Sequence, residues 1–399
     1  MRRSRYSKAR SPPTSARIWA EVSKRLGKRA EGIVKEASEI IAALDRGGIV
    51  SSLLGLGDNT NAYLVKGDTI LGFERKELEA TPAAGVDSSS TKPVRVGHHY
   101  YGVVSAAVVA YPEGRNGNIL EEILAETAVT PDRAEPAQAM QELNLLMFET
   151  ELRALRLAPK LLEASKDKYV VFLDGPIIDP PHVIGGSLQE KFEEYIRERA
   201  QTVRDIIENG GFVIGIVKRV YGSLFVNTLS RELSNELGEI LADRRVSDYS
   251  LAVYLGAILV MRNLFEPGRH TMVLHPFSLD DAGIVAAEFY RKEGVNVYSF
   301  LMIPVIGGKG KEGKPIRVEF ALPNDANAME ATRRAAALID AWLLHGHNVP
   351  EPVMLAHMRC TIRRRDASRM LREIATRSIY LALTKLGSQG LQFVTTEVI

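Results

Sequence analysis

Short apolar runs alternate with long helical patterns along most of the chain, and this alternation constrains the fold more than any other feature. The first runs are residues 83–87, 100–111 and 169–174, and helical spacing of apolar residues covers about 134–162 and 188–209. Strands that alternate with helices of this length are typical of a sheet with crossover connections. We therefore expect an α/β fold with a mixed β-sheet flanked by helices.

The same pattern continues toward the C-terminus. The run 210–220 predicts a buried strand that is closed by Lys218 and Arg219. The remaining expected elements are strands at 270–277, 295–305 and 316–323 and helices at 326–344 and 366–386, with Asp366 as N-cap and Gly387 as stop of the last helix.

The N-terminal part has a different composition. Residues 1–16 are polar and basic and contain two adjacent prolines, so we expect a disordered tail. Apolar spacing from Ile18 to Leu44 predicts one or two helices, and the turn-rich segment that follows predicts short strands. We expect residues 17–80 to form an appendage to a main domain at 81–399.

Charge and cysteine content exclude several classes of protein. The net charge of the 399 residues is only +2, so any nucleic-acid surface must be local rather than spread over the chain. The single cysteine, Cys360, excludes an intramolecular disulfide and a cysteine-based metal site. No apolar stretch reaches the length of a membrane span. We expect an intracellular, cytoplasmic protein.

An arginine cluster near the C-terminus is the strongest local basic feature. Such a cluster suits the backbone phosphates of nucleic acid, although clusters of this kind are more often a solvated face or a frayed tail. Its members are Arg359, Arg363, Arg364 and Arg365, followed by Arg369 and Arg372.

A phosphate-binding loop is nearly matched at 308–314. Pro315 stands where the loop needs Ser or Thr, and a strand pattern follows where a helix should begin. Without a helix N-terminus the anion site lacks its amides and dipole. We expect a basic turn at Lys309–Lys314, and an ATPase built on it is a remote hypothesis.

Three acids define the most informative constellation. Asp87 and Asp174 each end an apolar strand pattern, where ligands bind in open α/β sheets, although each is also a common turn residue. Glu151 projects from the apolar face of the 134–162 helix, whereas Glu149 is closer to the charged face. A buried carboxylate needs a partner, either a metal ion or a buried arginine or lysine. The three acids together would suit Mg²⁺ or Mn²⁺ better than zinc.

Two further residues are candidates beside these acids. Lys218 would place a cation near a phosphate, and it is also explained as an ordinary strand-end lysine. His357 lies in the apolar run "VPEPVMLAHMRC", where a histidine is usually a hydrogen-bonded core group but can ligate a metal or exchange protons. Two divalent ions held by such residues can activate water and stabilise the leaving oxygen of a phosphodiester.

Several short segments of the chain, taken in their order along the sequence, resemble those of the NurA nucleases. The matching pieces span about residues 84–358 and are "VDSS", the inward glutamate, "FLDGPI", "VIGIVKR", "SDYSLAVYLG", "IRVEFALP" and "PVMLAH". The resemblance implies an RNase H-like core, a homodimer and a DNA nuclease that uses manganese or magnesium. It also implies a HerA-type hexameric translocase as partner in archaeal DNA end resection and homologous recombination, alongside the double-strand-break repair nuclease and its ATPase partner.

The resemblance implies roles for individual residues. Asp87, Glu151 and Asp174 are the implied metal-binding carboxylates, and His357 is a further active-site residue and metal ligand. Lys218 matches the strand-end lysine of the family, and Asp248 in "SDYS" matches a recurrent acid of open role. The implied activity is cleavage of single-stranded DNA and of ends, chiefly 5′ to 3′, with the arginine cluster on the DNA backbone.

Three positions depart from the family pattern. Ser88 stands where glycine usually follows the first aspartate, Pro176 where Ser or Thr is common, and Val349 where some members have tyrosine. A serine with φ above zero would be strained. None of these departures removes a metal carboxylate. The alternative function is an RNase H-like adaptor that binds DNA and the translocase without cutting, which Ser88 and Val349 favour.

Overall fold

The structure is a computed structural model of the chain. The expected tail 1–16, residues 18–30 of the first expected helical region, loop residues 305–313 and Gly387 lie outside the residues that it describes. The described residues are 31–45, 62–66, 69–70, 72–96, 99–130, 135–162, 168–179, 188–232, 241, 245–262, 270–304, 314–344 and 347–386.

Five strands form the core of the sheet. Their spatial order is β7-β6-β4-β8-β9, with β6 antiparallel to β4 and β7, and with β8 and β9 parallel to β4. Numbered along the chain, this order is 3-2-1-4-5 with an antiparallel second strand, which is the topology of an RNase H-like core. The expected mixed α/β fold is therefore confirmed. The strands are β4 (Ala83–Ser90), β6 (His99–Tyr111), β7 (Leu120–Val129), β8 (Tyr169–Leu173) and β9 (Gly211–Val217).

The sheet continues beyond β9 through antiparallel strands. The β1–β10 pair joins the expected N-terminal appendage to the main sheet. Two short strands pair at the side, β5 (Val94–Val96) with β6 and β11 (Phe277–Ser278) with β12. In order from β9, the added strands are β13 (Ile316–Pro323), β12 (Val295–Ile303), β10 (His270–Val273), β1 (Ala62–Lys66), β2 (Thr69–Ile70) and β3 (Phe73–Glu74).

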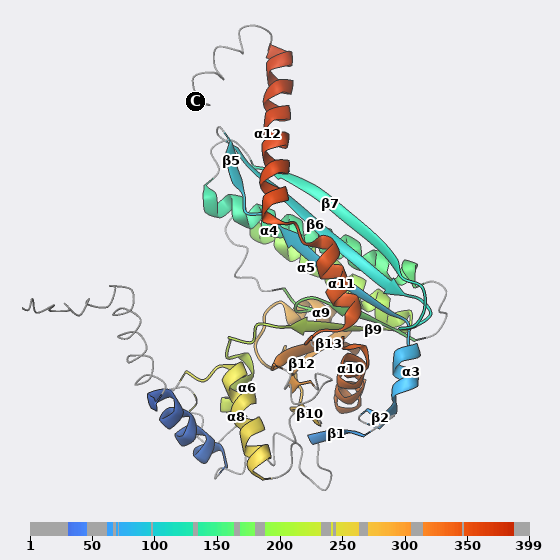
Figure 1. The fold of residues 1–399 in the computed structure, drawn as a ribbon, viewed down its shortest axis with the longest axis vertical. Helices are drawn as coiled ribbons and strands as arrows, with labels where there is room; N and C mark the ends of the chain where they lie inside the picture. Colours follow the sequence, from blue (N-terminus) through green and yellow to red (C-terminus); the bar gives the residue numbers. More distant parts are fainter. Residues whose placement is uncertain are drawn as a thin grey trace, which may run out of the picture.

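Helices cover both faces of the sheet (Figure 1). Because alternate strand residues point to opposite faces, Val86 and Leu173 pack in one apolar cluster whereas Phe172 and Ile214 pack in the other. The first layer is α4 (Pro136–Leu161), α5 (Gln189–Glu208) and α9 (Ala287–Lys292), and the second is α3 (Arg75–Ala80), α10 (Ala328–Trp342) and α11 (Glu351–Cys360).

The remaining described helices lie at the two ends of the molecule. A helix at residues 31–45, α6 (Leu224–Glu232) and α8 (Asp248–Met261) pack in a third cluster with residues of β10 and β12. At the other end, α12 (Arg364–Leu386) extends away from the body beside β5 and β6 (Figure 1), and Leu371 packs on Tyr101 and Val103. No described helix is both long and apolar enough to span a bilayer.

Several elements differ from the sequence-based expectation. Strand β7 was not predicted, because its residues are largely exposed and show no buried alternation. The expected strand at 270–277 is two short strands, β10 and β11, separated by three residues. The segment around His357 forms a helix, α11, rather than only a short apolar run. Asp366 is not the N-cap that we expected, since α12 already begins at Arg364.

Candidate active site

Asp87 and Asp174 lie side by side on neighbouring strands of the sheet. Strands β4 and β8 run parallel with Val86 opposite Leu173, so the next residue of each strand reaches the same edge of the sheet. The Asp174 amide donates to the Val86 carbonyl at 2.9 Å, which extends the ladder by one step. The two aspartates are therefore neighbours in the sheet, but Asp87 lies inside β4, which continues to Ser90 rather than ending at Asp87 as the sequence pattern predicted.

Helix α11 lies directly on β4. A Cβ on Gly85 would come within 2.1 Å of the Pro352 carbonyl carbon, so only glycine allows this approach of the two backbones. The Tyr111 hydroxyl donates to Glu351 Oε1 at 3.1 Å at the start of the helix, and the Ser105 hydroxyl donates to the Cys360 carbonyl at its end. These contacts fix α11 over the strand that carries Asp87.

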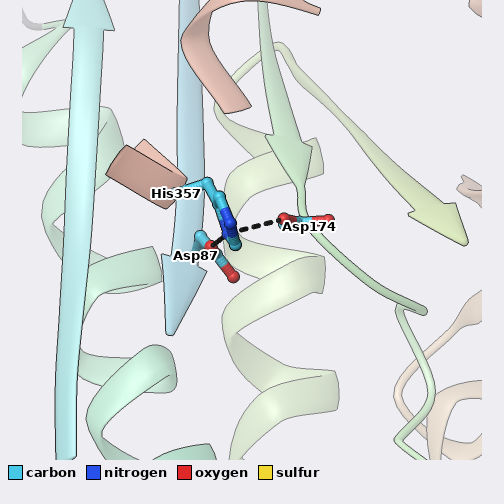
Figure 2. Close-up of side chains that lie close together, drawn as sticks. All are labelled: Asp87, Asp174 and His357. Carbon is cyan, nitrogen blue, oxygen red and sulfur yellow. Dashed lines mark hydrogen bonds and ion pairs between the residues drawn. The ribbon is translucent and has the colours of Figure 1, made fainter. Parts of the chain in front are cut away.

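His357 projects from α11 into the gap between the aspartates (Figure 2). Its Nδ1 lies 2.7 Å from Asp87 Oδ2 and 3.5 Å from Asp174 Oδ2. One ligand atom from each of the three residues lies within 4.8 Å of the others, and no other such group was found among the described residues. The aspartate side chains are 7% and 6% exposed whereas the imidazole is 54% exposed, so the histidine forms the open side of the cluster.

The cluster carries an excess of negative charge. Burial, followed by the carboxylates of Asp174 and Glu151, raises the pKa of Asp87 to about 7, although hydrogen bonds from His357 and Cys360 act in the opposite direction. Lys218 Nζ lies 2.5 Å from Asp174 Oδ2 and partly balances the second aspartate.

Cys360 is not a nucleophile in this site. Burial and the neighbouring Asp87 carboxylate raise the pKa of its thiol far above the ordinary value. The protonated Sγ instead donates to Asp87 Oδ2 at 3.3 Å. The cysteine therefore orients the aspartate on the side opposite solvent.

Asp87, Asp174 and His357 fit a divalent cation. Two buried carboxylates and an imidazole offer oxygen and nitrogen donors of the kind that Mg²⁺ or Mn²⁺ takes. A cation would also remove the repulsion that raises the pKa of Asp87.

Glu151 approaches this cluster from the opposite helical layer. Its Oε1 accepts hydrogen bonds from both terminal nitrogens of Arg199 at 3.0 Å, and its Oε2 accepts from the Ser88 hydroxyl at 2.6 Å. The buried-arginine partner, left open by the sequence, is therefore present. Glu151 lies beside the three-residue group rather than within it, and Glu149 lies on the exposed surface of α4.

Arg199 is the main residue that the sequence analysis missed. It lies on α5 four residues after Tyr195 and is flanked by the buried Ile196, Ala200 and Val203. The sequence did contain a signal for it, because Arg199 is a charged residue at an apolar position of an amphipathic helix.

The other predicted residues have diverse positions. Asp248 is fully buried and accepts the Val226 amide at 3.0 Å, which ties α8 to α6 and gives it a structural role. Ser88 lies in β4 without positive φ, so the expected strain is absent. Val349 is buried in the core of the second layer, where it packs rather than faces the cluster.

The arginine cluster begins next to the site. Arg359 donates from Nε to Glu121 Oε2 on β7 at 2.6 Å, and Arg363 is exposed. Arg364 and Arg365 open α12, but their side chains lie outside the described residues. Of the basic turn expected at Lys309–Lys314, only Lys314 is described, and it is exposed.

An RNase H-like sheet with buried aspartates and a histidine at the carboxyl edge of its central strands is the arrangement of a nuclease. A model of the NurA domain matches residues 82–362, which is more than half of the chain. The chain belongs to the NurA family. This assignment confirms the resemblance that the sequence motifs indicated.

Solved structures show weaker likenesses. The NurA nuclease from Sulfolobus solfataricus is 14% identical over 92% of this chain and 98% of that chain, with a TM-score of 0.48. Endonuclease V from Ciona intestinalis, in complex with DNA, is 14% identical over 87% of this chain and 99% of that chain, with a TM-score of 0.31. No curated protein matched the sequence. The family match therefore carries the assignment.

Proposed function

We propose that the protein hydrolyses phosphodiester bonds of DNA with a divalent metal ion held by Asp87, Asp174 and His357. The observation that carries this proposal is the convergence of these three side chains at one edge of the sheet, within 4.8 Å. The ion, when bound, supplies an acidified water molecule and positive charge for the phosphate. Glu151 faces the same place and is the further carboxylate of the site.

The remaining residues orient the donors and the substrate. Cys360 and the Ser88 amide hold the two oxygens of Asp87, the latter at 2.8 Å. Lys218 is 40% exposed beside Asp174, so it can turn toward a phosphate once another cation balances that carboxylate. The exposed edge of His357 faces the solvent side from which a strand enters.

We further propose single-stranded DNA and DNA ends as substrates, cut chiefly in the 5′ to 3′ direction, with Mn²⁺ as the preferred ion. Arg359, Arg363, Arg364 and Arg365 would contact backbone phosphates beside the cluster. Membership of the NurA family supports a homodimer that works in the cytoplasm with a HerA-type hexameric translocase in end resection and recombinational repair. The repair nuclease and its ATPase partner would act in the same process.

One observation favours the alternative of a non-cutting adaptor. The Ser88 hydroxyl donates to Oε2 of Glu151, and Arg199 donates to Oε1. Both oxygens of this carboxylate therefore already accept a hydrogen bond. An adaptor predicts DNA binding that survives chelation and gives no products at any metal concentration.

The test is digestion of an end-labelled single strand with Mn²⁺ or with EDTA. We expect cleavage that requires the metal and is abolished in Asp174→Ala, whereas Asp205→Ala, which removes an exposed aspartate on α5, retains activity. Full activity of the Asp174→Ala protein would contradict the proposal.

A further inference from the structure

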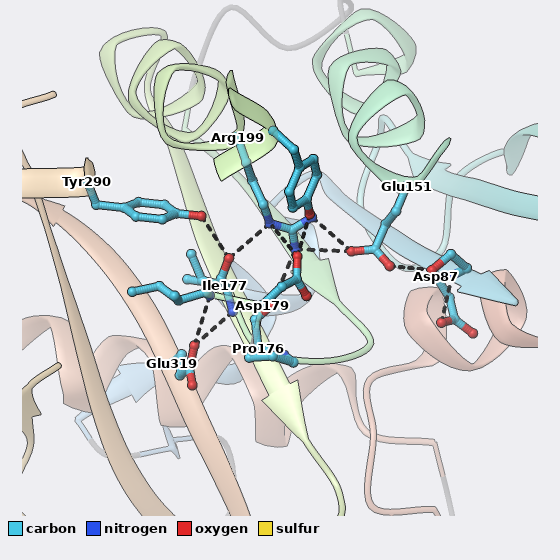
Figure 3. A network of polar contacts seen from close by, with 11 residues as sticks. Asp87, Glu151, Pro176, Ile177, Asp179, Arg199, Tyr290 and Glu319 are labelled. Carbon is cyan, nitrogen blue, oxygen red and sulfur yellow. Dashed lines mark hydrogen bonds and ion pairs between the residues drawn. The ribbon is translucent and has the colours of Figure 1, made fainter. Parts of the chain in front are cut away.

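Arg199 is completely buried beneath the candidate site. Its side chain is 0% exposed, and its guanidinium lies between α4, α5 and the loop that follows β8 (Figure 3). Buried arginines need partners for their charge and for their N–H groups. The identity of those partners shows what the residue holds in place.

The first set of partners is the loop directly after Asp174. Arg199 Nε donates to the Ile177 carbonyl at 2.9 Å, and Nη2 donates to the Pro176 carbonyl at 3.3 Å. Gly175 has φ of +149°, which allows the chain to turn sharply behind Asp174. The position of the aspartate is thus coupled to the arginine through two or three residues of backbone.

The same loop is held from its other side (Figure 3). Glu319 Oε2 accepts the amides of Ile177 and Ile178 at 2.8 and 3.3 Å, and the Tyr290 hydroxyl donates to the Ile177 carbonyl at 2.8 Å. Both the N–H and the C=O of Ile177 are therefore bound to buried side chains.

The second set of partners is the carboxylate of Glu151. Both terminal nitrogens of Arg199 bind Oε1 of Glu151 at 3.0 Å. Among the described residues, Arg199 is the side chain that binds both this glutamate on α4 and the loop behind Asp174. One guanidinium thereby links Glu151 on α4 to the backbone that follows Asp174, on one face of the sheet.

A third partner, Asp179, allows a purely structural role of Arg199 to be tested. Arg199 Nε lies 3.5 Å from Asp179 Oδ2, and Tyr195, whose hydroxyl accepts from Arg199 Nη1 at 3.0 Å, donates to the same Asp179 carboxylate. This branch of the network supports the arginine without touching Glu151 or the loop carbonyls. Changes in the two branches therefore separate positioning from general packing.

We propose that Arg199 is a positioning residue that fixes Glu151 relative to Asp174 before the metal ion arrives. This inference rests on the proposed function, because it assumes that the acids bind a cation. The planar guanidinium of Arg199 suits the role because it donates five hydrogen bonds from a fixed geometry, whereas lysine retains the charge but has only three donors. Residues that orient metal ligands typically contribute a factor of about 10–100 to metal affinity.

The test compares Mn²⁺ binding to Arg199→Lys and to Tyr195→Phe, measured by calorimetry without DNA. We expect Arg199→Lys to weaken Mn²⁺ binding by about 10-fold or more. Tyr195→Phe, which disrupts only the Asp179 branch, should remain within about twofold of the wild type. Equal affinity of wild type and Arg199→Lys, or an equal loss in both variants, overturns the inference. If the wild type itself binds no Mn²⁺, the proposed function fails instead.

A second measurement keeps the inference testable if Arg199→Lys does not fold. Hydrogen exchange of the amides of Ile177 and Ile178 in the wild type reports whether the loop is ordered without metal. A loop fixed in advance is protected in metal-free protein and gains less than about twofold protection from Mn²⁺. Protection that develops only after Mn²⁺ is added overturns the proposal.

Discussion

The Nδ1 atom of His357 lies 2.7 Å from Oδ2 of Asp87, although 270 positions separate the two residues in the chain. The contact depends on α11 lying against β4 at Gly85, where no side chain keeps the backbones apart. The histidine thereby completes a cluster whose two carboxylates come from other elements.

His357→Ala is expected to weaken Mn²⁺ binding and reduce DNA cleavage by about 10²-fold, because the open side of the pocket loses its nitrogen donor. The imidazole is 54% exposed, so the thermal midpoint should hardly change. His347→Ala, which removes another exposed histidine, is the control and should cleave normally. Unchanged cleavage by His357→Ala would remove the histidine from the site.

Asp87→Asn should stabilise the metal-free protein at pH 8 while abolishing cleavage. The native pKa of Asp87 is about 7 and its ordinary value is 3.8, so the native state binds more protons between these values. The free energy of unfolding of the metal-free protein therefore falls as pH rises across this window, by at most about 4 kcal/mol. Asparagine mimics the protonated aspartic acid, so the gain in stability of Asp87→Asn over the wild type should disappear near pH 4.

Thermal melts of metal-free protein at pH 8 and pH 4 check this prediction. Asp174→Asn is the matched control, because Lys218 already balances that carboxylate and no gain is expected. A destabilised Asp87→Asn protein at pH 8 would show that Asp87 is not under electrostatic strain.

Lys218→Ala is expected to separate chemistry from metal binding. The ammonium lies 2.5 Å from Asp174 Oδ2, so its removal takes away a competing cation and should leave Mn²⁺ affinity equal or higher. The cleavage rate at saturating Mn²⁺ should fall by about 10²-fold if the lysine stabilises charge on the phosphate. Lys168 precedes β8 at the end opposite Asp174, so Lys168→Ala should change neither the Mn²⁺ affinity nor the cleavage rate. Weaker Mn²⁺ binding by the Lys218→Ala protein would argue against a role of Lys218 in catalysis alone.

Gly85→Ala should displace α11 and with it His357. The new Cβ would meet backbone atoms of Pro352 and Val353 at 2.1–2.4 Å, and backbone cannot move aside as a flexible side chain does. We expect a loss of about 1–3 kcal/mol in unfolding free energy and of about 10²-fold in cleavage. Gly256→Ala in α8 is the control, since its Cβ would meet only Ile303 at 3.5 Å. Denaturant melts and cleavage assays would detect both effects, and a fully active Gly85→Ala protein would contradict the account.

Glu121→Gln should strengthen binding of single-stranded DNA. Glu121 and Arg359 form an ion pair at 2.6 Å in which both side chains are more than 40% exposed, so the pair contributes about 1 kcal/mol or less. Freeing Arg359 for a phosphate should raise the salt slope of DNA binding by about one. Glu122→Gln on the same strand is the charge-matched control. A Glu121→Gln protein with unchanged affinity and slope would place the DNA elsewhere.

The positions of Asp87 and Asp174 were predictable because each follows a buried run, and the carboxyl ends of parallel neighbours meet at one edge. Glu151 was predictable as an inward side chain from helical spacing. Its partner was not, because spacing within α4 contains no information on which residue of α5 lies opposite. Arg199 had a signal of its own, but only the packing of the two helices reveals what it binds.

The missed elements have other physical causes. Strand β7 is largely exposed and none of its residues is buried, so it lacks the buried apolar positions that mark a strand in a sequence. Helix α8 is apolar around its whole circumference, so it has no face pattern to reveal its packing. Helix α11 is short and begins beside two prolines, and its placement depends on a close approach to Gly85.

The location of His357 on α11 has a consequence during protein synthesis. The pocket needs β4, β8 and a helix that follows nearly all of the sheet in the chain, so the ribosome must pass residue 360 before the pocket can close. Domains generally fold as units, so the cluster is complete only once α11 has been synthesised. A truncated product that ends before α11 has both aspartates but lacks His357, so under the proposed function it would not cut nucleic acid in the cell that makes it.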